Sequence, residues 1–173
     1  MELFAAIMGR RSVRKFDIAR PVSREMLEKI VLAGVEAPSG CNMQLRQFVI
    51  VDEPAVLAKL APLSRALTGA PACIAILAEP KASPYGEYWR QDASASMQNM
   101  LLAATGLGLG SCWIEGGFDR NEDIIREILH VPPTLRVCSL MSVGYAAEPG
   151  KRPEKSLPRD VTHYNRFGEK SDK

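Results

Sequence analysis

The chain has 173 residues, of which 46% are hydrophobic and 24% charged, and its formal net charge is +2. This length favours a single domain that spans residues 1–173, and the nearly balanced charge gives no support to a nucleic-acid-binding protein. No apolar run approaches the roughly 20 residues that span a bilayer, and basic residues follow the first apolar run instead of preceding it, so we expect a cytoplasmic protein.

Apolar residues repeat at helical spacing in some segments and form short continuous runs, typical of buried strands, in others. In chain order, the expected elements are a helix over residues 2–9, a helix opened by Pro21 and Ser23 and ending near Gly34, a loop over 37–42, a strand over 48–51, a helix beginning at 52–54, a strand over 72–78, a long helix over about 91–107, a strand over 111–114, a helix near 119–129 and a strand over 137–143.

The order of these elements, helices interleaved with four short strands, on its own favours a parallel α/β sheet, although an α+β sheet flanked by helices is compatible with it. Asp119 and Glu122 are spaced as a capping box, which predicts that the last helix begins beside Asp119. From Ala146 onward the chain is polar and rich in proline, so we expect no further packed layer there.

The usual signatures of side-chain chemistry are missing from the sequence. The two histidines, His130 and His163, stand outside any metal-ligand spacing, and neither G-x-S-x-G nor the G-x-x-x-x-G-K-[ST] loop occurs, so we predict no metal site. The glycines of residues 106–110 close a helix instead of opening one, which is the wrong context for a dinucleotide fingerprint. If the protein is an enzyme, a bound cofactor has to supply its chemistry.

The four cysteines show no C-x-x-C pairing. Three of them, Cys73, Cys112 and Cys138, lie in apolar stretches and are expected to be buried thiols that behave as small hydrophobes. Cys41 lies in a polar loop and could be exposed, and no neighbouring histidine suggests an activated nucleophile.

Four separated segments resemble the nitroreductase family, in the family's usual order. Residues 10–16 (RRSVRKF) resemble its R-R-S-[VI]-R-x-[FY] opening, and residues 37–44 (APSGCNMQ) are similar to its A-P-S-x-x-N-x-Q loop. Residues 98–104 and 108–114 resemble its Q-N-[ML]-L-L-A-A and G-L-G-[ST]-x-W-I segments, and Gly144-Tyr145 followed by basic residues resembles its C-terminal part.

This resemblance implies an FMN site. Arginine suits the bidentate grip of a phosphate, so the basic run, which by itself would be read as a solvated surface, is interpreted as a phosphate clamp. The residues implied at the phosphate and ribityl end are Arg10, Arg11, Ser12 and Arg14, with Lys151, Arg152 or Lys155 approaching from the far end of the chain.

The flavin ring has carbonyl oxygens and ring nitrogens that amide and hydroxyl groups can bind. The residues implied there are Pro38, Ser39, Gly40, Asn42 and Gln44, which in the family reach a flavin held mainly by the other subunit, and Trp113, Ile114, Glu115, Gly116 and Gly117, which run beside the ring. A backbone N–H at or near Glu115 and Gly116 is implied to face the reactive nitrogen of the flavin, where it would stabilise negative charge.

The family's fold is α+β, with a mostly antiparallel central sheet flanked by helices and an intertwined homodimer, and we let this expectation override the parallel sheet. The long helix is the expected dimer element. The implied activity is an FMN-dependent NAD(P)H oxidoreductase that reduces nitroaromatics, quinones or similar electron-poor molecules by a ping-pong mechanism, with NADH or NADPH as donor. Two alternatives remain: a related flavin-fold enzyme, such as a reductive dehalogenase or a flavin-modifying enzyme, and a non-catalytic FMN-binding module.

The sequence departs from the family pattern at several places. Leu45-Arg46 stands where the family usually has Pro-Trp, so Arg46 is expected to alter the charge near the substrate pocket, and Ala146 replaces a common proline. The short chain leaves little room for helices that cover the pocket in longer relatives, which predicts an open active site.

Overall fold

The computed structural model describes residues 2–82, 86, 88–115 and 118–170. Its helices and strands, in chain order, are α1 (Leu3–Gly9), α2 (Arg24–Val35), β1 (Arg46–Val51), α3 (Pro54–Leu60), β2 (Ala72–Ala78), α4 (Trp89–Gly106), β3 (Gly110–Ile114), α5 (Phe118–Ile128), β4 (Arg136–Gly144) and α6 (Pro158–Val161), with short 3-10 turns at Gly40–Asn42, Ala61–Leu63 and Pro80–Ala82.

The four strands form one sheet in the order β1-β2-β4-β3, and every neighbouring pair is antiparallel. The α+β expectation is therefore confirmed, and the parallel sheet favoured by element order alone is wrong. Element order does not determine strand direction, because a helix between two strands can return the chain to either end of the sheet.

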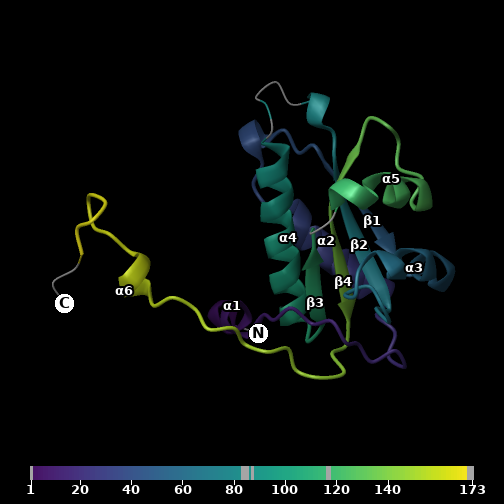
Figure 1. Cartoon of the computed structure of the whole chain (residues 1–173), viewed down its shortest axis with the longest axis horizontal. Coiled ribbons are helices and arrows are strands. Elements are labelled where there is room, and N and C mark those ends of the chain that lie inside the picture. The colour runs from purple at the N-terminus through teal and green to yellow at the C-terminus, as the bar shows by residue number, and fades with distance from the viewer. Residues whose placement is uncertain (1, 83–85, 87, 116–117, 171–173) are drawn as a thin grey trace.

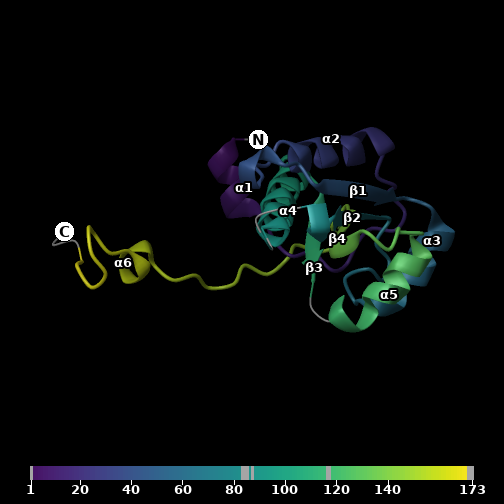
Figure 2. The same cartoon turned by 90° about the horizontal axis from the view of Figure 1, so that it is seen from above.

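The sheet lies between two helical layers (Figures 1 and 2). One apolar cluster joins one face of the sheet to α2 and α4, through side chains such as Leu27, Ile74 and Met97. A second cluster joins the other face to α3 and α5, through side chains such as Leu60, Ile125 and Leu140. Every residue of β2 is buried, because β2 is an inner strand covered on both faces.

The helix starts follow local chemistry. The Ser23 side chain accepts a hydrogen bond from the backbone N–H of Met26 at the start of α2, as expected for an N-cap, and Pro54 occupies the first turn of α3. The capping-box prediction for α5 is wrong, because the helix already begins at Phe118 and the Glu122 carboxylate is bound to Arg136 of β4 instead.

Beyond β4 the chain pairs with the N-terminal segment and then leaves the body of the protein. The backbone N–H of Asp17 donates to the Tyr145 carbonyl at 2.8 Å, and the N–H of Ala147 donates to the Lys15 carbonyl at 3.0 Å. The tail then runs past α1 to α6, which lies far from the sheet in both views (Figures 1 and 2).

The cysteine expectations hold in outline. Cys73 and Cys112 are buried, Cys138 is half-buried and Cys41 is exposed, and all four are free thiols. None of the helices in the described ranges combines the length and apolarity that crossing a membrane requires.

Candidate active site

The basic segment that follows α1 lies along the exposed edge of the sheet. Ser12 forms an isolated parallel bridge with Ser111 of β3, and the backbone N–H of Val13 donates to the Ser111 carbonyl at 2.9 Å. Gly110 makes this close approach possible, since a Cβ atom at that position would lie 2.8 Å from the Val13 side chain. The start of β3 therefore holds the basic segment in place.

Three of the expected phosphate ligands converge beside this strand. Burial raises the pKa of the Cys112 thiol, and the positive charge of Arg14, a hydrogen bond with Ser12 and the charge of Arg10 all act against that rise. These effects place the side chains of Arg10 and Arg14 within electrostatic range of one thiol of β3, with Ser12 beside it. Ser12 and Arg14 are exposed, so their polar groups remain available to a ligand.

Arg11 has a different environment from its neighbours. Its Nη1 atom donates to the carbonyls of Met8 and Arg10, both at 2.7 Å, and so binds two carbonyls at the end of α1. Gly150 packs directly against it, because a Cβ at Gly150 would lie 2.7 Å from the Cβ of Arg11.

The contact at Gly150 brings the start of the C-terminal basic group to the same region. Lys151 follows Gly150 directly, so its backbone lies beside the Arg11–Ser12 segment, whereas no contact among the described residues places Arg152 or Lys155 there. All three side chains are exposed. Next to them, the buried Ser111 hydroxyl has no hydrogen-bond partner among the described residues.

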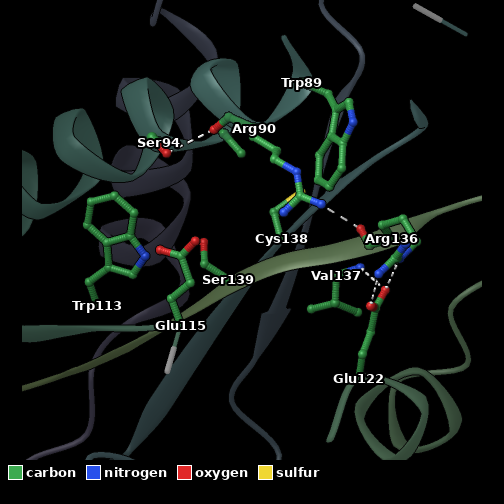
Figure 3. Close-up of a pocket in the computed structure, with 11 residues that line it drawn as sticks. Trp89, Arg90, Ser94, Trp113, Glu115, Glu122, Arg136, Val137, Cys138 and Ser139 are labelled. Atoms are coloured by element: carbon green, nitrogen blue, oxygen red, sulfur yellow. Dashed lines mark hydrogen bonds and ion pairs between the residues drawn. The ribbon is translucent and has the colours of Figure 1, made fainter. Parts of the chain in front are cut away.

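A small cavity lies at the other end of β3. It has a volume of about 170 Å³. Figure 3 shows Trp89, Arg90 and Ser94 of α4 on one side, with Trp113 and Glu115 on the other. Ile114 is buried on the opposite face of the sheet, in the cluster with α5. Gly116 and Gly117, which were also expected beside a flavin ring, lie outside the described residues.

Charged and aromatic groups line this cavity. The guanidinium of Arg90 lies over the Trp89 ring, 4.5 Å from its centroid. Glu122 is paired with Arg136, and the hydrogen bond from Arg136 is the main cause that lowers the pKa of the Glu122 carboxyl. The indole Nε1 of Trp113 is buried without a hydrogen-bond partner among the described residues.

The loop of residues 37–44 lies beside the start of α4. Its backbone is unusual, because Cys41, Asn42 and Gln44 have φ angles of 49°, 54° and 52°. The Ser39 hydroxyl accepts the backbone N–H of Gln44 at 3.1 Å, and the Gln44 side chain donates to Asn42 Oδ1 at 3.3 Å.

Within this loop, Pro38, Asn42 and Gln44 are exposed, while Ser39 and Gly40 are half-buried. The loop therefore presents several of its polar groups outward.

Arg46 does not bring its charge to the pocket, contrary to the expectation from the sequence. Its guanidinium points inward and donates to the carbonyls of Ala37 and Pro38 and to α4. Two further residues were not predicted from the sequence: Asp92, which binds this loop at Gly40, and Ser96, which binds Arg46. Polar residues at positions 92, 96 and 99 of an otherwise largely apolar helix were the available signal, because that spacing places them on one face.

The sequence motifs thus assemble along β3: Ser12 and Val13 meet its first two residues, Arg10 and Arg14 lie within electrostatic range of Cys112 at its middle, and Trp113 and Glu115 lie at its end. A strand of five residues spans roughly 17 Å. This arrangement suits an elongated ligand with an anionic end and a flat end. Within the described residues, no cluster of three or more His, Cys, Asp or Glu side chains could hold a metal ion.

Comparison with known proteins identifies similar chains. The model of the nitroreductase family matches residues 7–68 and 63–145. A protein of Archaeoglobus fulgidus, provisionally named NADH dehydrogenase/NAD(P)H nitroreductase, is 39% identical over 150 residues, which cover 83% of this chain and 85% of the relative.

Solved structures show the same fold. An FMN-dependent nitroreductase of Clostridium difficile has a TM-score of 0.82 and 32% identity, and the match covers 95% of this chain and 99% of that one. A provisionally named nitroreductase of Desulfovibrio desulfuricans, solved in complex with FMN, has a TM-score of 0.83 and 30% identity, with 95% and 97% covered.

Proposed function

This chain belongs to the nitroreductase family, and we propose that it is an FMN-dependent NAD(P)H oxidoreductase that reduces electron-poor small molecules such as nitroaromatics or quinones. The observation that carries this proposal is the pairing of a cationic segment beside β3 with a cavity, lined by Trp89 and Trp113, at the end of the strand. FMN has a phosphate and a flat ring system at its two ends, so its chemistry fits both groups.

We assign the phosphate to Arg10, Ser12 and Arg14. Two guanidinium groups and a hydroxyl offer donors for the oxygens of a group that carries close to two negative charges. Lys151 is the nearest candidate for a further cation, since Gly150 packs on Arg11. We also assign Arg152 and Lys155 to the phosphate, from the sequence alone. Arg11 stabilises the end of α1, which fixes the direction in which the basic segment leaves the helix.

We assign the ring to the end of β3. Bound FMN would accept a hydride from the nicotinamide and pass the electrons to the oxidant. Trp113 and Glu115 would border the ring, and the backbone N–H at or near Glu115 and Gly116 would donate to its reactive nitrogen. The contribution of the protein is then to position the substrates and to stabilise negative charge, and no side chain has to act as a nucleophile or general base.

A ping-pong sequence follows from one shared pocket. Donor and oxidant both have to contact the same reactive atom, so the nicotinamide, oxidised once its hydride is transferred, would leave before the oxidant enters. Arg46 points inward, and the described cations that line the cavity are Arg90, over the Trp89 ring, and Arg136, paired with Glu122.

We also propose that the protein works as a homodimer. The cavity of about 170 Å³ is smaller than the roughly 300–1,000 Å³ of typical ligand pockets, so one chain does not enclose the site. Large apolar side chains of α1 and of the tail are exposed, among them Leu3, Phe4 and Phe167. Exposed apolar groups at two ends of the chain suit burial against a second copy.

Four free cysteines agree with a cytoplasmic location.

The test is the visible absorbance spectrum of the purified protein, with mass spectrometry of the released chromophore. We expect flavin bands, the mass of FMN, and bleaching when NADPH or NADH is added without oxygen. A protein that carries FMN but does not oxidise either nucleotide would be a binding module. A colourless protein that takes up no added FMN would overturn the proposal.

A further inference from the structure

Arg46 is the centre of a hydrogen-bond network behind the loop of residues 37–44. Its Nη2 donates to the Ala37 carbonyl at 2.8 Å, and its Nη1 donates to the Pro38 carbonyl at 3.1 Å. The same Nη1 lies 2.7 Å from the hydroxyl of Ser96 and 3.2 Å from the backbone carbonyl of Asp92, both on α4. One side chain of β1 therefore ties the first residues of the loop to the long helix.

Asp92 holds the next part of the same loop. Its Oδ1 accepts the backbone N–H of Gly40 at 2.9 Å, and the residue is only 8% exposed. A buried carboxylate needs a nearby positive charge and hydrogen-bond donors. Asp92 has the Gly40 N–H as a donor, and the charge of Arg46 is close enough to interact with it.

The network also reaches α2. The Ser96 hydroxyl donates to the Gly34 carbonyl at 2.7 Å, and the Asn99 side chain donates to the Ala33 carbonyl at 3.1 Å. The loop is thus attached to β1 and α4, and α4 is in turn bonded to α2. Such multiple attachment is what a strained backbone requires, and this loop has three non-glycine residues in the left-handed region.

We infer that Arg46 is a positioning residue, which acts together with Ser96 and Asp92 to hold the loop of residues 37–44 in the shape that binds the flavin. This inference rests on the proposed function. The exposed face of the loop carries Asn42 and Gln44, which would contact the ring, while Arg46 holds the opposite face. Arg46 touches neither the cofactor nor the substrate and acts through the loop.

The experiment compares FMN binding and loop protection in matched variants. Arg46→Ala removes four hydrogen bonds, and Arg46→Lys keeps the charge and a donor. Ser96→Ala removes one of these four bonds and also the bond from the buried Ser96 hydroxyl to the Gly34 carbonyl. Arg24→Ala is the control, because Arg24 makes a bidentate pair with Asp52 that lies outside the site. The readouts are the FMN Kd of the apoprotein, measured by flavin fluorescence, and hydrogen exchange of peptides over residues 37–44 and 72–78.

We expect Arg46→Ala to raise the FMN Kd at least tenfold and to accelerate exchange in the loop while β2 keeps its protection. Ser96→Ala should raise the Kd about threefold, Arg46→Lys should recover most of the loss, and Arg24→Ala should leave Kd and loop exchange unchanged. If Arg46→Ala does not fold, Ser96→Ala decides the question by the same two readouts.

Two results would overturn the inference. In one, Arg46→Ala and Ser96→Ala bind FMN within twofold of the wild type with unchanged loop exchange. In the other, exchange rises equally in the loop and in β2, which indicates general destabilisation. Failure of the wild type to bind FMN would instead remove the proposed function, so the two failures are distinguishable.

Discussion

Arg136 binds both carboxylate oxygens of Glu122, with Nε at 2.6 Å from Oε1 and Nη2 at 2.5 Å from Oε2 (Figure 3). Glu122 also accepts the backbone N–H of Val137 at 3.0 Å. One carboxylate therefore joins α5 to the first residues of β4 at the rim of the cavity. Its side chain is only 12% exposed, so water screens the pair less than it screens most surface ion pairs.

This pair makes stability depend on pH. Because the folded state lowers the pKa of Glu122, its contribution is complete above the unfolded pKa of about 4.3 and is lost as the pH falls through the lower folded value. We expect Glu122→Gln to cost roughly 1–2 kcal/mol at pH 7, and the difference from the wild type to shrink below about pH 4. Urea denaturation of the FMN-free protein at several pH values measures both effects.

Glu25→Gln is the control for this prediction. The pKa of Glu25 is also lowered, by its hydrogen bond to Lys29, but that pair is fully exposed on α2. We expect no measurable change in unfolding at any pH. A Glu122→Gln variant whose stability tracks the wild type from pH 7 to pH 3 would contradict the assignment.

The pairing of Glu122 with Arg136 could not be predicted from the sequence. The spacing of Asp119 and Glu122 is that of a capping box, and nothing local distinguishes it from a true one. The bond that Glu122 makes instead joins it to a residue 14 positions away, across the gap between a helix and a strand. Element order alone favoured the wrong strand direction for a similar reason, since the pairing of β2 with β4 is non-local, and the family resemblance was needed to predict the antiparallel sheet. Ser23 and Pro54, whose partners lie within one helical turn, were predicted correctly.

A second prediction concerns the contact between β3 and the basic segment. A methyl group at Gly110 would lie within 2.9 Å of three atoms of Val13, which is buried and β-branched and so has little freedom to move. We expect Gly110→Ala to cost about 1–3 kcal/mol and to weaken FMN binding, because Ser12 and Arg14 would shift with Val13. Denaturation and FMN titration test the two parts separately.

Gly106→Ala provides the matched comparison. Gly106 is the last residue of α4, and a Cβ there would meet no atom within 4 Å. This variant should be as stable as the wild type or slightly more so, with the same FMN affinity. Equal behaviour of the two alanine variants would show that the close approach at Gly110 is not required.

A third prediction tests the phosphate assignment. Arg14→Ala should raise the FMN Kd roughly tenfold to a hundredfold, as expected when a charged hydrogen bond worth about 1.5–3 kcal/mol is lost. The loss should be largest at low salt, because the interaction is between charges. Riboflavin lacks the phosphate, so its weaker binding should be equal in the variant and the wild type. If Arg14→Ala and Arg10→Ala both retain FMN fully, the phosphate lies elsewhere.

The candidate site was predicted unevenly. The residues of the first motif, Arg10, Ser12 and Arg14, were placed at one point because they lie within five positions of each other, and a short segment can hardly separate them. The inward orientation of Arg46 was not predicted, because two of its hydrogen-bond partners lie on α4, 46 and 50 positions away. The sequence around an arginine next to a loop is the same whether its side chain points outward or inward.

The last prediction is the homodimer. In a dimer with two-fold symmetry, each interface residue occurs once in each subunit. A single substitution therefore changes the interface at two places. Ile7 of α1 is 44% exposed and Ile124 of α5 is 46% exposed, and the two helices lie on opposite sides of the sheet (Figure 2). They form a matched pair of positions, because the residue type and the exposure are nearly the same.

We expect the wild type to have twice the 19.0 kDa mass of one chain by light scattering. Ile7→Gln should dissociate at a protein concentration at least tenfold higher than the wild type, since burying two unpaired amides costs about 1–3 kcal/mol each. It should also release FMN on dilution, because a single chain lacks the loop of its partner. Ile124→Gln should remain dimeric with FMN bound. A wild type of single-chain mass that retains one FMN per chain would rule out a site shared between subunits.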